Sequence, residues 1–360
     1  MTAEPAYPYP RSAGLSALRL RPLPGRRPVS LLLHRRSAAV AGVLLAVLAA
    51  AMLASACLGR TAVTPYDVWH VVRGGAGPYA LVVGELRLPR IVLGAMVGAA
   101  FGAAGALVQS VTRNPLASPD VIGVGHGAAA ATVLALTTGT VAAPGALPAV
   151  SVAGGLAAAG LVYVLAWRHG MQPGRFVLSG VGMGVALSAV VHLYLTDSDL
   201  EAAEQLKLWL TGSLNGRGWE QAGPLGCVLL LCLPALLWAS RVLRPLGLDA
   251  DTAAALGVRV RRVHLGLTVL GVVLAASATG AAGPVGFVAL TSPQLARRIT
   301  RTPQLPLLCS ALTGAVVVVV ADLAARTVLT PLEIPVGAVT ALVGGPYLLW
   351  LLGKSAGTGR

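Results

Sequence analysis

Charged side chains are scarce in this chain: they make up 11% of its 360 residues, whereas a soluble domain carries about 25%. Aromatic residues are also few, at 4%, while 56% of the residues are hydrophobic and 44 are glycine. A chain with a mean hydropathy of +0.77 cannot cover a water-facing surface, so soluble, disordered and collagen-like proteins are excluded. Because one membrane span needs about 20 apolar residues, the composition predicts an all-α polytopic membrane protein with about ten transmembrane helices.

Lysine is nearly absent, because Lys207 and Lys354 are the only two, and the net charge of +14 therefore rests on arginine. A basic balance of this size in a soluble protein would suggest a nucleic-acid partner. Here the arginines lie in short runs between apolar segments, which is how orientation is encoded in membrane proteins. The charge therefore indicates topology, and no nucleic-acid partner is predicted.

Cysteine and histidine are too scattered to form a reactive site. The four cysteines lie within or at the ends of apolar runs and the six histidines are isolated, so neither disulfides nor a metal centre is predicted. A phosphate loop is also missing, since Gly353, Lys354 and Ser355 resemble its end but Leu348 stands where it needs a glycine. We expect the chain to be no enzyme and to bind no cofactor, so that ATP with its magnesium must bind to another subunit.

The first 36 residues differ from the rest of the chain. They are rich in proline, contain seven arginines and lack apolar periodicity, so residues 1–36 are expected to form a disordered basic tail on the cytoplasmic side. The next run, 37–58, contains a stretch from Leu53 to Cys57 that resembles a lipoprotein cleavage site. The preceding basic region is unusually long for a signal peptide, so we expect an uncleaved first helix. Residues 37–360 then form one membrane domain.

Ten apolar runs account for the expected spans. They lie at 37–58, 90–109, 120–138, 147–167, 176–195, 222–240, 263–282, 284–296, 306–325 and 335–352, of which 284–296 is short. With the N-terminus inside, 20 of the 27 basic residues fall on the cytoplasmic side, and five of the 13 acidic residues gather in the external stretch 197–220. The positive-inside rule therefore places both termini in the cytoplasm.

Ionisable residues inside the spans are rare. Asp322 is the main one, and Arg326 lies four residues later on the same helical face, which predicts a structural ion pair. A proton- or sodium-driven carrier would need more intramembrane acids, so this scarcity argues against an ion-coupled secondary transporter. Small residues recur at helical spacing and predict close helix contacts. They are Gly94, Gly98 and Gly102 in the second span and Gly180 and Gly184 in the fifth.

Hydrophilic blocks interrupt the apolar runs in a definite order. They lie at 86–90, 112–120, 212–216, 248–258, 283–290, 321–326 and 333–337. The fourth block predicts a short cytoplasmic helix over 249–258, in which Asp249 or Asp251 caps the start and Gly257 ends it. A short helix between two spans on the inner face is suited to docking a cytoplasmic partner.

Taken in this order, the blocks resemble the permease family of type II ABC importers for iron–siderophore complexes, haem and cobalamin. The resemblance covers about residues 60–353, and 113–120, 212–216 and 251–258 are most similar to permeases of the ferric-enterobactin type. It implies ten helices with inverted repeats, formed by helices two to five and seven to ten. It also implies a second permease subunit, a dimer of cytoplasmic ATPases, an external substrate-binding protein and a location in the bacterial cytoplasmic membrane.

The resemblance assigns roles to three groups of residues. Outer arginines that meet acidic residues on the two lobes of the binding protein match Arg87, Arg90 and Arg326, which could instead anchor helices at the membrane interface. Positions near the inner gate of the pathway match Asn114, Pro115 and Leu116. The coupling helix that enters a cleft of the ATPase matches Asp249, Asp251, Thr252, Ala254, Leu256 and Gly257.

The predicted function is to move a ferric siderophore, of the ferric-enterobactin type, across the cytoplasmic membrane. ATP binding would close the ATPases, push the coupling helices and shift the permease pair between inward-open and outward-open states. Haem and cobalamin are alternative substrates within the family. An ion-coupled secondary transporter and a membrane protein without transport activity are alternatives of other classes.

Overall fold

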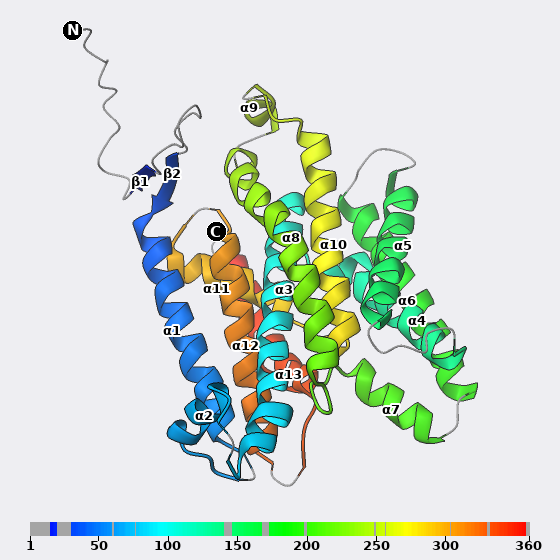
Figure 1. Cartoon of the computed structure of the whole chain (residues 1–360). Coiled ribbons are helices and arrows are strands. Elements are labelled where there is room, and N and C mark those ends of the chain that lie inside the picture. The colour runs from blue at the N-terminus through cyan, green and yellow to red at the C-terminus, as the bar shows by residue number, and fades with distance from the viewer. Residues whose placement is uncertain are drawn as a thin grey trace, which may run out of the picture.

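The computed structural model describes residues 15–19, 30–59, 61–75, 77–139, 146–167, 173–197, 200–247, 250–255, 257–302, 304–329 and 332–357. Its long helices run roughly side by side, with α3 (Leu88–Thr112) in the middle (Figure 1). The short helix α9 (Ala250–Ala255) lies at one end of this bundle and α2 (Pro65–Val72) at the other. We refer to these as the α9 end and the α2 end.

Each of the ten expected apolar runs contains a helix, which confirms the predicted all-α membrane fold. Besides α3, they are α1 (Arg35–Cys57), α4 (Val124–Thr137), α5 (Leu147–Trp167), α6 (Pro173–Asp197), α8 (Trp219–Leu246), α10 (Val260–Ala282), α11 (Val288–Thr300), α12 (Leu307–Thr327) and α13 (Val336–Gly357). Seven helices of the described segments are long and apolar enough to cross a membrane. The short run at 284–296 becomes α11, which has 13 residues and ends in arginines, too short for a complete span.

Helices α3–α6 and α10–α13 follow the same order of lengths: long, short, long and long. The first group has 25, 14, 21 and 25 residues, and the second has 23, 13, 21 and 22. Each short helix also begins after a residue with a positive φ, 79° at Gly123 before α4 and 66° at Phe287 before α11. This correspondence supports the predicted pair of related halves.

Part of the predicted disordered tail has regular structure. Strands β1 (Leu15–Arg19) and β2 (Ser30–His34) pair antiparallel, with Leu15 opposite His34, and β2 leads directly into α1. These two segments are the locally apolar stretches LSALR and SLLLH, and the disordered basic tail stays a prediction for residues 1–36 as a whole. Three small elements complete the described chain: a π-helix, η2 (Val82–Arg87), a 3-10 helix, η3 (Pro119–Ile122), and α7 (Leu200–Leu210).

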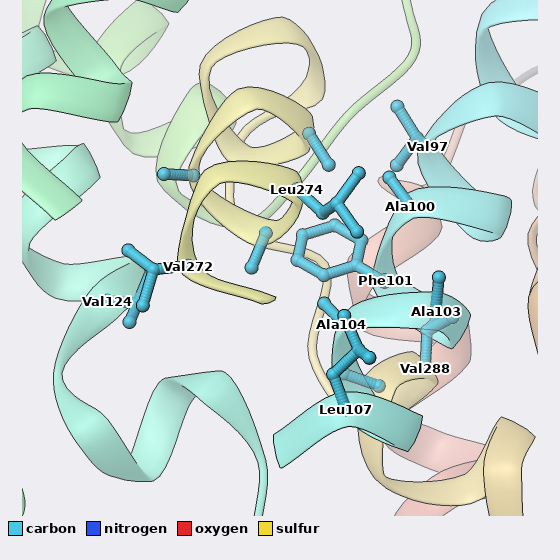
Figure 2. Packing of buried hydrophobic residues seen from close by; sticks show 14 of the residues in the cluster. Val97, Ala100, Phe101, Ala103, Ala104, Leu107, Val124, Val272, Leu274 and Val288 are labelled. Carbon is cyan, nitrogen blue, oxygen red and sulfur yellow. The ribbon is translucent and has the colours of Figure 1, made fainter. Parts of the chain in front are cut away.

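Helix α3 is the centre of the core, where it packs against α8, α10, α11 and α12. Figure 2 shows this region, in which Phe101 of α3 lies beside Leu274 of α10 and both side chains are almost fully buried. Apolar residues therefore recur all around α3, as they do in a helix that is enclosed by others.

Glycines bring α3 and α12 into close contact. A side-chain carbon added at Gly98 would collide with the main chain of Gly314, and one added at Gly102 would collide with that of Ser310. In the fifth span, Gly184 faces the ring of His126. The small-residue spacing in the sequence thus marks points at which helices approach closely. Because lipid tails are as apolar as the side chains, the hydrophobic effect does not drive helices together in a membrane, and their association depends on such close packing.

Replacing Gly98 with alanine is expected to destabilise the protein by about 1–3 kcal/mol, because the added methyl group forces two backbones apart. The matched control is Gly160→Ala in α5, where nothing lies within 4 Å of the added carbon. That change should stabilise by about 0.5–1 kcal/mol through helix propensity. Thermal unfolding of both variants in detergent measures the difference, and equal unfolding temperatures would contradict close packing at Gly98.

Candidate functional site

A buried carboxylate, that of Asp322 in α12, organises a polar cluster at the α2 end of the bundle. Asp322 is only 2% exposed. Arg90, in the first turn of α3, donates to its Oδ1 from Nε at 3.1 Å and from Nη2 at 2.9 Å. On the other side, the Nε atom of Arg326 lies 3.2 Å from Oδ2. The predicted Asp322–Arg326 pair is therefore confirmed, and a second guanidinium group shares the same carboxylate.

Arg90 connects this ion pair to two further segments. Its Nη1 atom donates to Oε2 of Glu333 at 3.1 Å and to Oδ1 of Asn215 at 3.5 Å. Glu333 precedes α13 and Asn215 precedes α8. One side chain thus holds four parts of the fold together, and four of the hydrophilic blocks seen in the sequence meet at this point.

Arg87 has a different role, at the end of the π-helix η2. Its side chain is buried, and it donates from Nη1 to the carbonyl of Ala56 at 2.7 Å and from Nη2 to that of Thr61 at 2.6 Å. The last carbonyl groups of a helix have no partner within the helix. Arg87 therefore satisfies the C-terminal end of α1 and the segment that follows it.

Arg326 contacts the same end of α1. Its Nη2 atom donates to the carbonyl of Ser55 at 3.2 Å and also to the Ser55 hydroxyl. Together with Arg87, it fixes the end of α1 against α3 and α12. Ser55 and Ala56 are both buried, so at these two residues an arginine satisfies a main-chain oxygen at the end of the helix.

Three loops pack tightly next to this cluster. The amide of Ser213 donates to the carbonyl of Ala282 at 2.9 Å, and the amide of Gly337 donates to that of Gly212 at 2.9 Å. Gly212 has a φ of 74°, and an added side-chain carbon there would collide with Pro284. The blocks at 212–216, 283–290 and 333–337, far apart in sequence, are therefore neighbours in space.

Arg217 adds another positive charge beside Asn215. Its side chain is half-buried, and within the described residues its Nε atom has no hydrogen-bond partner. Removal from water lowers the pKa of the Arg217 guanidinium below its usual value. Sequence reasoning gave Arg217 no site role, because a single arginine in a loop has no distinguishing spacing.

These positions change the interpretation of the three arginines expected to dock a binding protein. Arg87 is buried and bound to carbonyl groups, which favours the alternative of a helix anchor, and its docking role stays a prediction. The side chains of Arg90 and Arg326 are 11% and 10% exposed, and both engage Asp322. Among the described residues, Arg90 and Arg326 pair with Asp322 and Glu333, whereas Arg87 and Arg217 form no ion pair, so the cluster itself holds four guanidinium groups and two carboxylates.

At the α9 end, the expected short helix is present as α9. Its C-terminal end is well defined: the amide of Gly257 donates to the carbonyl of Ala254 at 2.9 Å and that of Val258 to Ala253 at 3.0 Å. With a φ of 83° at Gly257, these bonds form a Schellman cap, as the glycine predicted. Asp249 and Leu256 lie outside the described residues, as does the side chain of Asp251, so the predicted N-terminal cap stays a prediction.

Two residues of α9 show which side of it is free. Ala253 is fully buried, whereas Thr252 and Ala254 are exposed. α9 contacts α8 and α10, the two long helices that it joins. Its exposed side therefore points away from the bundle, where a partner can reach it.

The residues of the expected inner gate form a tight turn after α3. Arg113 ends this helix with a φ of 51°, and the amide of Leu116 donates to Oδ1 of Asn114 at 2.9 Å. Asn114 and Pro115 are exposed and Leu116 is half-buried. The turn links α3 to η3 and thus the long helix to the short helix α4.

The fold and its sites define a class of protein: a polytopic helical membrane protein with a polar cluster at one end and a short, partly exposed helix at the other. The model of the FecCD transport family matches residues 46–354 of the chain. The chain therefore belongs to the FecCD transport family, as its hydrophilic blocks predicted.

Curated relatives and a solved structure agree with this assignment. The chain is 38% identical to the ferric enterobactin transport system permease protein FepG of Escherichia coli (strain K12), covering 84% of this chain and 94% of the relative. It is 40% identical to the achromobactin transport system permease protein CbrC of Dickeya dadantii (strain 3937), covering 85% of this chain and 88% of the relative. An inward-facing structure of a metal-chelate type ABC transporter matches with a TM-score of 0.76 and 29% identity, over 88% and 99% of the two chains.

Proposed function

We propose that this chain is the membrane-spanning permease subunit of an ATP-driven importer for ferric siderophore complexes of the ferric-enterobactin type. The observation that carries the proposal is the match to siderophore permeases over nearly their whole length. The bacterial cytoplasmic membrane is the corresponding location, with both termini in the cytoplasm, so the α9 end faces inward and the α2 end outward. ATP and magnesium bind to the partner ATPase.

The assembly that we propose contains two permease subunits, identical or related, around one pathway, with a dimer of ATPases at the α9 end. The exposed side of α9 supports this, since Thr252 and Ala254 are free for a partner while Ala253 holds the helix on the bundle. The turn formed by Asn114, Pro115 and Leu116 then serves as the inner gate, because it connects the central helix α3 to the short helix α4.

We place the docking surface for an external binding protein around Arg90 and Arg326. The arginines of the polar cluster support an acidic partner, because the planar guanidinium group suits carboxylates. Arg87 acts indirectly by fixing the end of α1. A charge reversal at Arg90 would not isolate docking, because it would place two carboxylates against each other at Asp322.

Uptake of radiolabelled ferric chelates in a strain that lacks this permease tests the function. We expect the chain to restore uptake of ferric enterobactin, and only together with its ATPase. The purified chain in liposomes should transport nothing under a proton or sodium gradient. Accumulation of the chelate by the chain alone would overturn the ABC assignment in favour of a secondary transporter. Restored uptake of haem or cobalamin, and not of ferric enterobactin, would show that one of these is the substrate.

Replacing Glu333 with glutamine is expected to strengthen capture of the binding protein about two- to fivefold, because it removes an exposed carboxylate that competes for Arg90. The matched control is Glu220→Gln, which removes an exposed carboxylate from the first turn of α8. Affinities measured in nanodiscs at low salt give the comparison. An equal gain in both variants would mean that only the overall charge matters.

A further inference from the structure

Five arginines gather on the α9 side of the bundle where α1 and α11 meet, and we call them the α1–α11 arginine cluster. Its members are Arg35 and Arg36 at the start of α1, and Arg297, Arg298 and Arg301 at the end of α11. All are exposed except Arg297, which is half-buried. None takes part in the transport machinery proposed above.

Packing between helices far apart in sequence brings these arginines together. Ala41 of α1 and Ala296 of α11 belong to one buried apolar group with Cys309 of α12. The Cys309 thiol also donates to the carbonyl of Ser37 at 3.5 Å. Since Ser37 follows Arg36 and Ala296 precedes Arg297, both ends of the cluster lie against the same contact. Figure 1 shows the upper part of α1 beside α11 accordingly.

No carboxylate of the described segments pairs with the positive charge of this cluster. The sequence contains no aspartate or glutamate between residues 5 and 66 or between 252 and 321, which include α1 and α11. Within the described segments, none of the five arginines forms an ion pair; Arg298 instead lies over the ring of Trp350, 4.8 Å from its centre. Among the described residues, the five guanidinium groups thus have no anionic partner.

Exposed apolar side chains occur on the same helices and on the start of α12. Val43 in α1 is 63% exposed, Leu308 in α12 is 64% exposed and Ile299, between two of the arginines, is 42% exposed. Charge next to exposed aliphatic side chains is the pattern that a phospholipid with an anionic headgroup fits.

We propose that the α1–α11 arginine cluster is a binding site for an acidic phospholipid of the inner leaflet. The headgroup phosphate binds to guanidinium groups from α1 and α11, and the acyl chains lie along Val43 and Leu308. Guanidinium groups bind phosphate through paired hydrogen bonds, which makes arginine suited to this contact. The positive-inside rule explains why these arginines lie at the cytoplasmic end of their helices. It does not explain why arginines from two different helices lie next to each other, beside exposed apolar side chains.

The test is a triple variant of the full chain, Arg297→Gln with Arg298→Gln and Arg301→Gln, purified in detergent. Native mass spectrometry measures binding of added phosphatidylglycerol and phosphatidylcholine. We expect the unaltered chain to prefer phosphatidylglycerol and the triple variant to bind it about tenfold to hundredfold more weakly. A second variant, Arg35→Gln with Arg36→Gln at exposed positions, should weaken binding in the same direction and leaves α11 intact.

The matched control removes three exposed arginines elsewhere on the same side, as Arg241→Gln with Arg259→Gln and Arg262→Gln. The control should keep its phosphatidylglycerol affinity. Replacing Arg297, Arg298 and Arg301 with lysine should lower the phosphatidylglycerol affinity less than replacing them with glutamine. The proposal is overturned if the control loses as much as the triple variant, or if inorganic phosphate competes as well as the lipid. It is also overturned if the triple variant keeps the lipid but loses the ATPase, because the arginines then belong to a protein interface.

Discussion

Replacing Asp322 with asparagine should lower the stability of the folded protein by about 3–5 kcal/mol, which is the usual cost of breaking a buried ion pair. Two guanidinium groups, those of Arg90 and Arg326, would lose the carboxylate that both contact. Less protein should accumulate in the membrane, and the purified variant should unfold at a markedly lower temperature. Thermal unfolding in detergent measures this directly.

Two further variants separate charge from packing at Asp322. Glu333→Gln removes a more exposed partner of Arg90 and should cost only about 0–1 kcal/mol. A triple replacement, Arg90→Met with Asp322→Leu and Arg326→Met, removes the buried carboxylate together with both of its guanidinium partners, so the triple variant should regain most of the stability that Asp322→Asn loses. An Asp322→Asn protein that unfolds at the normal temperature would show that Asp322 does not hold α3 and α12 together.

Replacing Ala254 with glutamate should abolish uptake while the protein stays folded in the membrane. Ala254 lies on the exposed side of α9, so a carboxylate there disturbs no contact within the chain. It would place an uncompensated charge in the proposed interface with the ATPase, and burying a charge without a partner is costly. Uptake and co-purification of the ATPase should therefore be lost together.

Ala254→Ser is the control, because it keeps a small side chain without a charge and should transport normally. Both variants should show the same thermal unfolding as the unaltered protein. Normal transport-coupled ATP hydrolysis in Ala254→Glu would mean that α9 does not transmit motion between the ATPase and the permease.

The local signals in the sequence predicted much of this protein. Apolar runs of span length located every long helix, because a backbone inside a membrane must satisfy its hydrogen bonds within a helix. Gly257 correctly located the end of α9, since only a residue that tolerates a positive φ can form that cap. The glycine spacing in α3 marked the close contact with α12, because small residues repeat on one helical face.

Contacts between distant segments were decided only by the tertiary structure. The i, i+4 rule found Arg326 as a partner of Asp322, but Arg90 is 232 positions away and reaches it only because α3 packs on α12. Arg87 looks like a second docking arginine in the sequence, yet the fold buries it against the end of α1. Hydropathy and helical periodicity are properties of neighbours along the chain, so they determined the helices, whereas the partner of each arginine depends on which helix ends meet.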